Sequence, residues 1–135
     1  MTDIQITLLT STEYYTYKSV IPLIEKTWWL CSPGEDSFDA DLVTSAGYIT
    51  CSWVVLDFGV RPVLHMNLPN AKSLNSGDKI RIGSKSFTIL SWERTKLIAL
   101  CDEVIAERRF DTRNNDWETS ELKQWLETKG LKLIF

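Results

Sequence analysis

The sequence predicts an α+β fold in which two helices accompany twisted, mainly antiparallel sheets. Three patterns support this fold class: runs that alternate apolar and polar residues, two segments with apolar residues at helical spacing, and short apolar runs separated by turn-forming residues between positions 28 and 68. A chain of 135 residues with 44% hydrophobic residues can bury a core without disulfides or metal. We therefore expect one globular domain.

The first elements are a strand and a helix. Residues 4–8 alternate apolar and polar side chains, which predicts a half-buried strand. Thr10 and Glu13 form the Thr-x-x-Glu pattern of a capping box, which satisfies free N–H groups at a helix start. The helix is expected to end near Ile21, because Pro22 disfavours helical backbone in the residue before it.

Several short strands are expected between positions 28 and 68, where Pro33-Gly34 and Phe58-Gly59 mark two of the turns. The continuous apolar run WVVL at positions 53–56 predicts a strand that is covered on both faces. Residues 69–77 are rich in Asn, Pro, Ser and Lys and are expected to connect two halves, 1–68 and 78–135.

The second half begins with a predicted hairpin, formed by residues 79–83 and 86–90 with its turn at Gly83-Ser84. A third strand is expected over residues 96–101.

A second helix is predicted to begin at Thr119 or Ser120 and to stop at Gly130, the residue type that most often ends helices. Its apolar face carries Leu122, Trp125 and Leu126, and residues 131–135 are expected to form an edge strand.

Charge and targeting signals restrict the function classes. The net charge is −3 and basic residues do not cluster, which disfavours nucleic-acid and anionic-membrane binding. The N-terminal residues lack a signal-peptide pattern, and no apolar run reaches the length of a membrane span. We expect a cytoplasmic protein of the producing or infected bacterium, with its three cysteines reduced and mostly buried.

Catalytic and metal-binding patterns are absent from the sequence. The single histidine, His65, lies at an alternating position and is predicted to be an ordinary strand residue. An enzyme would have to use His65 or Cys31, and neither is surrounded by a nucleophile motif or by zinc-ligand spacing. The expectation is a non-enzymatic chain without cofactor or metal.

Two features could carry recognition. The acidic residues Glu35, Asp36, Asp39 and Asp41 lack the regular spacing and central glycine of a calcium loop, so we expect a solvated acidic loop that contacts a basic partner. Adjacent strand residues point to opposite faces, which predicts that one tryptophan of the Trp28-Trp29 pair is buried and the other faces outward. The remaining tryptophans are Trp53, Trp92, Trp117 and Trp125, of which Trp125 is predicted to be core.

Three motifs carry a resemblance to a known family. WWLCSPG at 28–34, GVRP at 59–62 and WETSELKQWL at 117–126 resemble an uncharacterised bacterial and phage domain family marked by WWLRSPG, GVRPA and WENSxLRxWLN. The resemblance implies a C-type-lectin-like fold, related to formylglycine-generating enzymes, whose loops are available for recognition. Arg61, Trp117 and Trp125 would then be structural, with Arg61 in an ion pair or capping backbone carbonyls.

The chain departs from this family in two ways. Cys31 stands where the family has Arg, and the two halves occur in the opposite order. The reversed order implies a circular permutation, or two chains that exchange halves in a homodimer.

The expected function is a non-catalytic binding module that acts through protein–protein interaction, with a phage-encoded inhibitor of a host defence protein as the first candidate. A carbohydrate-binding lectin-like domain and a phage particle component are the alternatives. The predicted recognition surface combines residues 35–41 with the outward member of the Trp28-Trp29 pair.

Overall fold

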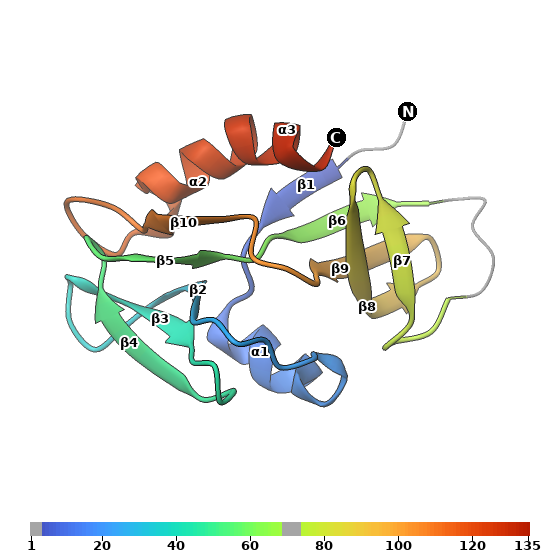
Figure 1. The fold of residues 1–135 in the computed structure, drawn as a ribbon, viewed down its shortest axis with the longest axis horizontal. Coiled ribbons are helices and arrows are strands. Elements are labelled where there is room, and N and C mark those ends of the chain that lie inside the picture. Colours follow the sequence, from blue (N-terminus) through green and yellow to red (C-terminus); the bar gives the residue numbers. More distant parts are fainter. Residues whose placement is uncertain (1–3, 69–73) are drawn as a thin grey trace.

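The computed structural model of the protein describes residues 4–68 and 74–135, so residues 69–73 of the predicted connecting loop lie outside the described residues (Figure 1). These described residues form two five-stranded sheets with helices packed against them. The predicted α+β class with two helices and mainly antiparallel sheets is therefore confirmed.

The first sheet is antiparallel throughout and mixes strands from both sequence halves. Its order is β1 (Ile4–Thr7), β6 (Val63–Asn67), β9 (Lys96–Cys101), β8 (Lys85–Glu93) and β7 (Lys79–Ile82). The predicted hairpin, its turn at Gly83-Ser84 and the strand over 96–101 are confirmed.

The second sheet also combines both halves. Its order is β10 (Ala106–Arg109), β5 (Asp57–Val60), β2 (Trp28–Pro33), β3 (Asp39–Val43) and β4 (Ile49–Trp53). The β2–β5 pair is parallel, and the other neighbours are antiparallel. The two halves of the sequence are therefore not separate units in space, because β10 completes a sheet whose other strands come from the first half.

Helix α1 (Ser11–Tyr17) begins as predicted. The Thr10 hydroxyl accepts a hydrogen bond from the Glu13 amide at 3.1 Å, and the Glu13 carboxylate accepts one from the Thr10 amide at 2.9 Å. A 3-10 turn (Lys18–Val20) follows, and the helical backbone ends at Ile21. Both ends of this helix thus follow from local sequence.

The C-terminal helix is longer than predicted. A 3-10 turn (Trp117–Thr119) precedes α2 (Glu121–Trp125), a π-helical segment (Leu126–Gly130) and α3 (Leu131–Ile134). Ser120 caps the start as predicted, whereas the stop at Gly130 and the edge strand over 131–135 are wrong. The helix continues because Ile134 extends the buried face of Leu122 and Leu126, and Gly130 keeps ordinary right-handed helical backbone.

Both tryptophans of the Trp28-Trp29 pair are buried, so the prediction that one faces outward is wrong. They do point to opposite faces of β2, but β2 is an interior strand whose two faces are both covered. Trp29 packs edge-on against Phe58, with ring centroids 5.1 Å apart, and Trp28 packs edge-on against Tyr14 at 5.8 Å.

The prediction of a doubly covered strand over 53–56 is also wrong. Strand β4 ends at Trp53, and the Leu56 amide donates to the Trp53 carbonyl at 3.1 Å as the chain turns toward β5. Of this run, Val54 alone is buried. The apolar run therefore forms an exposed turn at the end of the outer strand.

Candidate functional site

Three connections between elements meet at one end of the molecule, at the left of Figure 1. They are residues 34–38 between β2 and β3, 54–56 between β4 and β5, and 110–116 after β10. Backbone hydrogen bonds tie them together: the Val54 amide donates to the Phe38 carbonyl at 2.8 Å, and the Phe110 amide donates to the Val54 carbonyl at 2.9 Å.

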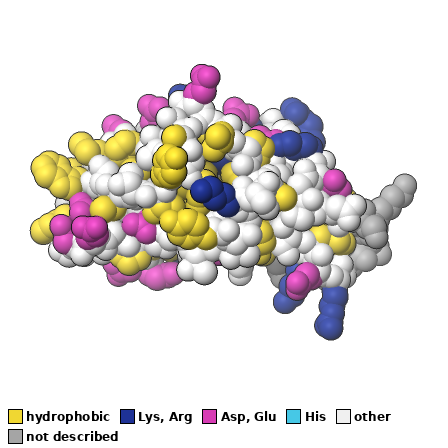
Figure 2. All heavy atoms as spheres, turned by 90° about the horizontal axis from the view of Figure 1, so that it is seen from below, with side chains coloured by type: hydrophobic (Ala, Val, Ile, Leu, Met, Phe, Trp, Pro, Cys, Tyr) yellow, Lys and Arg dark blue, Asp and Glu magenta, His cyan; other side chains and the backbone are white. Residues whose placement is uncertain are grey.

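A shallow apolar depression of about 290 Å³ lies where these connections meet, lined by Phe38, Trp53, Val54, Val55 and Thr112. The exposed fractions are 64% for Trp53, 62% for Phe38 and 50% for Val55. We call the exposed lining residues Phe38, Trp53, Val55 and Thr112 the loop-end surface. In Figure 2, hydrophobic and acidic side chains gather together at this end.

Because these side chains are exposed, the chain by itself does not gain the free energy that their burial would contribute. Burying an aromatic or branched side chain of this size contributes about 2 kcal/mol. Contiguous exposed apolar groups of this kind are uncommon on soluble domains and usually mark interaction sites. The loop-end surface is therefore a candidate binding site on physical grounds.

Two of the four predicted acidic residues border the loop-end surface. Glu35 and Asp36 are exposed in the connection that carries Phe38, and the Asp36 carboxylate accepts a hydrogen bond from the Phe38 amide at 3.0 Å. Asp39 and Asp41 instead belong to β3 and are partly buried. The predicted acidic loop thus divides into an exposed rim and a strand segment.

Asp39 is held in an unfavourable setting for a carboxylate. Its Oδ1 atom is buried and has no hydrogen-bond partner among the residues that the structure describes. Burial raises the pKa of Asp39, and the nearby carboxylates of Asp36 and Glu35 raise it further. Within the described ranges, no group of three or more His, Cys, Asp or Glu side chains is arranged to hold a metal ion.

Asn115 holds the acidic connection in place from the neighbouring one. Its side-chain amide donates to the Asp36 carbonyl at 2.8 Å and to the Asp39 carbonyl at 2.9 Å, and its backbone amide donates to the Ser37 carbonyl at 3.0 Å. A surface fixed in this way loses little conformational entropy on binding.

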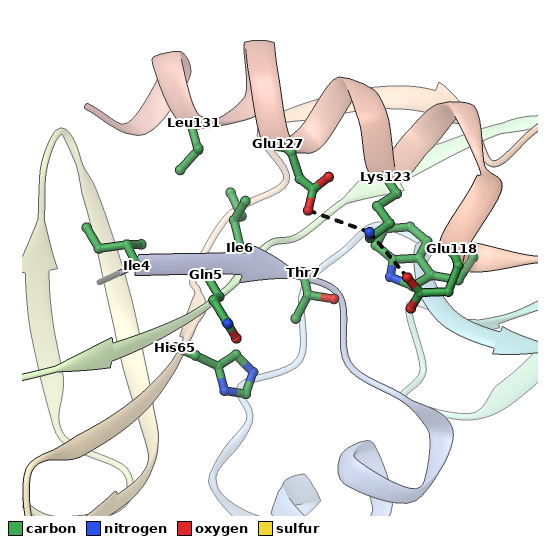
Figure 3. Close-up of a pocket in the computed structure, with 10 residues that line it drawn as sticks. Ile4, Gln5, Ile6, Thr7, His65, Glu118, Lys123, Glu127 and Leu131 are labelled. Atoms are coloured by element: carbon green, nitrogen blue, oxygen red, sulfur yellow. Dashed lines mark ion pairs between the residues drawn. The ribbon is translucent and has the colours of Figure 1, made fainter. Parts of the chain in front are cut away.

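A second hollow, of about 550 Å³, lies between β1 and the C-terminal helix (Figure 3). On the helix, the Lys123 ammonium forms ion pairs with Glu118 at 3.3 Å and with Glu127 at 3.7 Å. His65 lies on the other side of β1 beside Gln5, away from these charges. His65 also lines this hollow, together with Gln5, its register partner in the β1–β6 pair.

Cys31 lies in β2 of the second sheet, whereas His65 lies in β6 of the first. The Cys31 thiol donates to the Leu8 carbonyl at 3.4 Å. Burial raises its pKa to about 12, with the Glu13 carboxylate adding to the effect, so the thiol is protonated at neutral pH. All three cysteines are free; Cys101 is buried and the other two are partly buried.

Arg61 is buried and caps backbone carbonyls, one of the two roles expected from the sequence. Its Nε donates to the Cys101 carbonyl at 2.6 Å, and its guanidinium lies 4.9 Å from the Trp28 ring centre. Burial lowers its pKa to about 10. Trp117 packs on Phe110 at the edge of the core.

Trp125 is partly buried against the core and lies beneath the Arg108 guanidinium at 4.8 Å. It is therefore a packing residue at the rim of the core rather than a fully buried one.

Comparison with protein-family models, with curated proteins and with solved structures found no match to this chain. In the part of the chain that the structure describes, no helix combines the length and the apolar character needed to cross a membrane.

The residues that form the loop-end surface were missed as a group from the sequence. The sequence does contain a signal for part of this surface, because the fifteen residues 42–56 carry no charge and include Trp53. Within that stretch, the apolar run at 53–56 predicts a strand covered on both faces, because continuous apolar runs in strands are usually buried. The run is exposed instead because β4 lies at the outer edge of its sheet.

Proposed function

We propose that this chain is a non-catalytic protein-binding module that docks a partner protein on its loop-end surface. The observation that carries the proposal is the exposure of Trp53, Phe38 and Val55 around one apolar depression on connections that are tied together by hydrogen bonds. Tryptophan is among the residues most enriched at interface hot spots, where truncating one side chain costs about 2 kcal/mol or more of binding free energy.

We expect the contact surface of the partner to carry basic residues next to an apolar group. Glu35 and Asp36 border the depression, and the whole chain carries a net charge of −3. Complementary charges at the rim increase the association rate more than they increase the affinity. We therefore expect binding that weakens moderately with salt and strongly with loss of the apolar side chains.

A carbohydrate ligand is the second candidate, favoured by the exposed ring of Trp53, on which a sugar could stack. The other lining side chains supply one hydroxyl, from Thr112, whereas sugar recognition uses several converging polar groups. This composition supports the protein partner over the sugar. A glycan array with and without calcium separates the two, since the protein-binding proposal expects no retained glycan.

The resemblance to the WWLRSPG and GVRPA family extends the proposal to the fold and the origin. We infer a permuted C-type-lectin-like fold, in which the WWLCSPG motif is β2 and the GVRP motif ends β5. The same resemblance and the small acidic chain support a phage-encoded inhibitor of a host defence protein, located in the bacterial cytoplasm.

The proposal is tested by affinity capture from lysate of the producing cells. Trp53→Ser and Phe38→Ser are compared with Leu133→Ser, a matched control because Leu133 is 46% exposed on the C-terminal helix. Proteins retained by the wild type should be lost with the first two variants and kept with the control. Retention that is absent at about 10 µM, a concentration that detects affinities down to the micromolar range, or that ignores the loop-end variants, contradicts the proposal.

A further inference from the structure

Strand β4 is the outermost strand of the second sheet, so one of its edges pairs with β3 and the other is free of any strand among the residues that the structure describes. Unpaired strand edges present rows of N–H and C=O groups that pair readily with another chain. The free edge of β4 is therefore a place where a further strand can add.

Two hydrogen bonds at the ends of the β3–β4 ladder define which residues face outward. The Thr44 amide donates to the Tyr48 carbonyl and the Val54 amide donates to the Phe38 carbonyl, both at 2.8 Å. The N–H and C=O groups of successive residues point to opposite edges of an antiparallel strand. In β4, the main-chain groups of even-numbered residues therefore point toward β3, and those of odd-numbered residues point toward the outer edge. The outward residues are Ile49, Cys51 and Trp53.

Apart from the Trp53 carbonyl, these outward groups are available for pairing. Among the described residues, the Trp53 carbonyl accepts the turn bond from Leu56 at 3.1 Å, and the main-chain groups of Ile49 and Cys51 have no partner beyond the β3–β4 ladder. Proteins usually protect such edges with charged residues, proline or a bulge. The sequence of β4, ITCSW, contains none of these, and its pairing with β3 is regular.

The two ends of β4 carry opposite charges. At the start, the Lys18 ammonium lies 5.9 Å from the ring centre of Tyr48, which is 68% exposed. At the other end, Glu35 and Asp36 lie in the connection next to Trp53. An antiparallel copy of the same strand would bring the basic end of one chain to the acidic end of the other, whereas a parallel copy would bring like charges together.

We propose that β4 pairs antiparallel with β4 of a second copy of this chain, across a two-fold axis near Cys51. The two five-stranded sheets then join into one continuous sheet. Around the axis, Ile49 of each chain lies opposite Trp53 of the other, an aromatic and β-branched pair of the kind that stabilises antiparallel strands. The contact is isologous, so it closes at the dimer and does not propagate.

This dimer shares Trp53 with the loop-end surface but does not use Phe38, Val55 or Thr112. Trp53 ends β4 and the other lining residues lie outside the strand, so each dimer would present two such surfaces, one at each end of the paired strands. A contact built on one strand pair is smaller than the ~1,600 Å² of a standard stable interface. We expect dissociation in the micromolar range, with monomer predominant at high dilution.

Sedimentation equilibrium of the full chain tests the proposal directly. The wild type should shift from 15.5 kDa toward twice that mass as its concentration rises to about 100 µM. Cys51→Pro removes one outward N–H without touching the β3 ladder, and should weaken dimerisation at least tenfold. Cys51→Ser keeps the N–H and should dimerise as the wild type does.

A second pair of variants covers the case in which proline disturbs folding. Thr50→Lys places a charge on the exposed strand face, as natural edge strands do, and should also weaken the dimer at least tenfold, whereas Thr50→Ser should not. Circular dichroism checks that each variant is folded.

A wild type that stays monomeric at about 100 µM overturns the proposal. So does a dimer that survives both Cys51→Pro and Thr50→Lys, which is the result expected from an exchange of halves between chains. Phe38→Ser, which should abolish partner capture, should leave the dimer intact, so failure of one proposal is distinguishable from failure of the other.

Discussion

At the residue scale, Asp111 shows how a buried carboxylate can stabilise a connection. It accepts hydrogen bonds from the backbone amides of Glu121 at 3.2 Å and of Arg113 and Asn114 at 3.4 Å. Burial alone would raise its pKa, but these amide donors outweigh burial and the pKa is lowered. Because its side chain is fully buried, these backbone amides depend on its carboxylate as their hydrogen-bond acceptor.

We expect Asp111→Asn to reduce the free energy of unfolding by about 2 kcal/mol at neutral pH, the usual contribution of hydrogen bonds to a charged group. Since the folded pKa lies below the ordinary value of 3.8, this stabilisation is complete above pH 3.8 and is lost as the pH falls through the folded pKa. Urea unfolding at several pH values measures it. A difference between wild type and variant that does not narrow in acid contradicts this account.

Asp39 should behave in the opposite way. Burial, with help from Asp36 and Glu35, raises its pKa above 3.8, so its ionisation destabilises the folded chain as the pH rises through the folded pKa. Asp39→Asn should therefore gain stability relative to the wild type between acid and neutral pH. The same urea series tests this, and a stability difference that is constant or shrinks as the pH rises is the contrary result.

At the element scale, the β7–β8 turn holds the end of the C-terminal helix. The Ser84 amide donates to the Ile134 carbonyl at 2.7 Å, and the Ser84 hydroxyl donates to the Leu133 carbonyl at 3.0 Å. Gly83 has a φ of +59°, and a Cβ atom there would overlap the Ile134 carbonyl oxygen. Glycine is thus required both for the turn and for the close approach of the helix.

Gly83→Ala should lower the free energy of unfolding by about 2 kcal/mol, through left-handed backbone strain and displacement of the helix end. Ser84→Ala is the matched control, because it removes one exposed hydrogen bond and should lower stability by about 0.5 kcal/mol. Denaturant unfolding together with amide exchange in α3 measures both variants. If the two variants lose equal amounts of unfolding free energy, the turn does not hold the end of the helix.

The elements that were predictable are those defined by local chemistry. The capping box at Thr10 and Glu13 and the turn at Gly83-Ser84 each depend on residues next to one another in sequence. The helix end at Gly130 was not predictable, because continuation depends on Ile134 reaching a core built from distant strands.

At the scale of the whole molecule, the sequence could not reveal which strands lie at sheet edges. Alternation correctly predicted that Trp28 and Trp29 point to opposite faces, but not that Tyr14 of α1 packs on Trp28 while Phe58 and Phe110 pack on Trp29. The exposure of Trp53 could not be predicted for the same reason, since it depends on the strand order that makes β4 an outer strand. Strand order is determined by contacts between distant residues, which local patterns do not encode.

Site-specific photo-crosslinking in the producing cells tests the central proposal, protein binding at the loop-end surface, most directly. A photoreactive amino acid at position 38 is compared with one at position 133, which is also exposed but lies on the C-terminal helix. We predict that position 38 gives a discrete covalent product with a protein other than this chain, and that position 133 does not. No product at position 38, or equal products at both positions, would contradict a binding site at the loop-end surface.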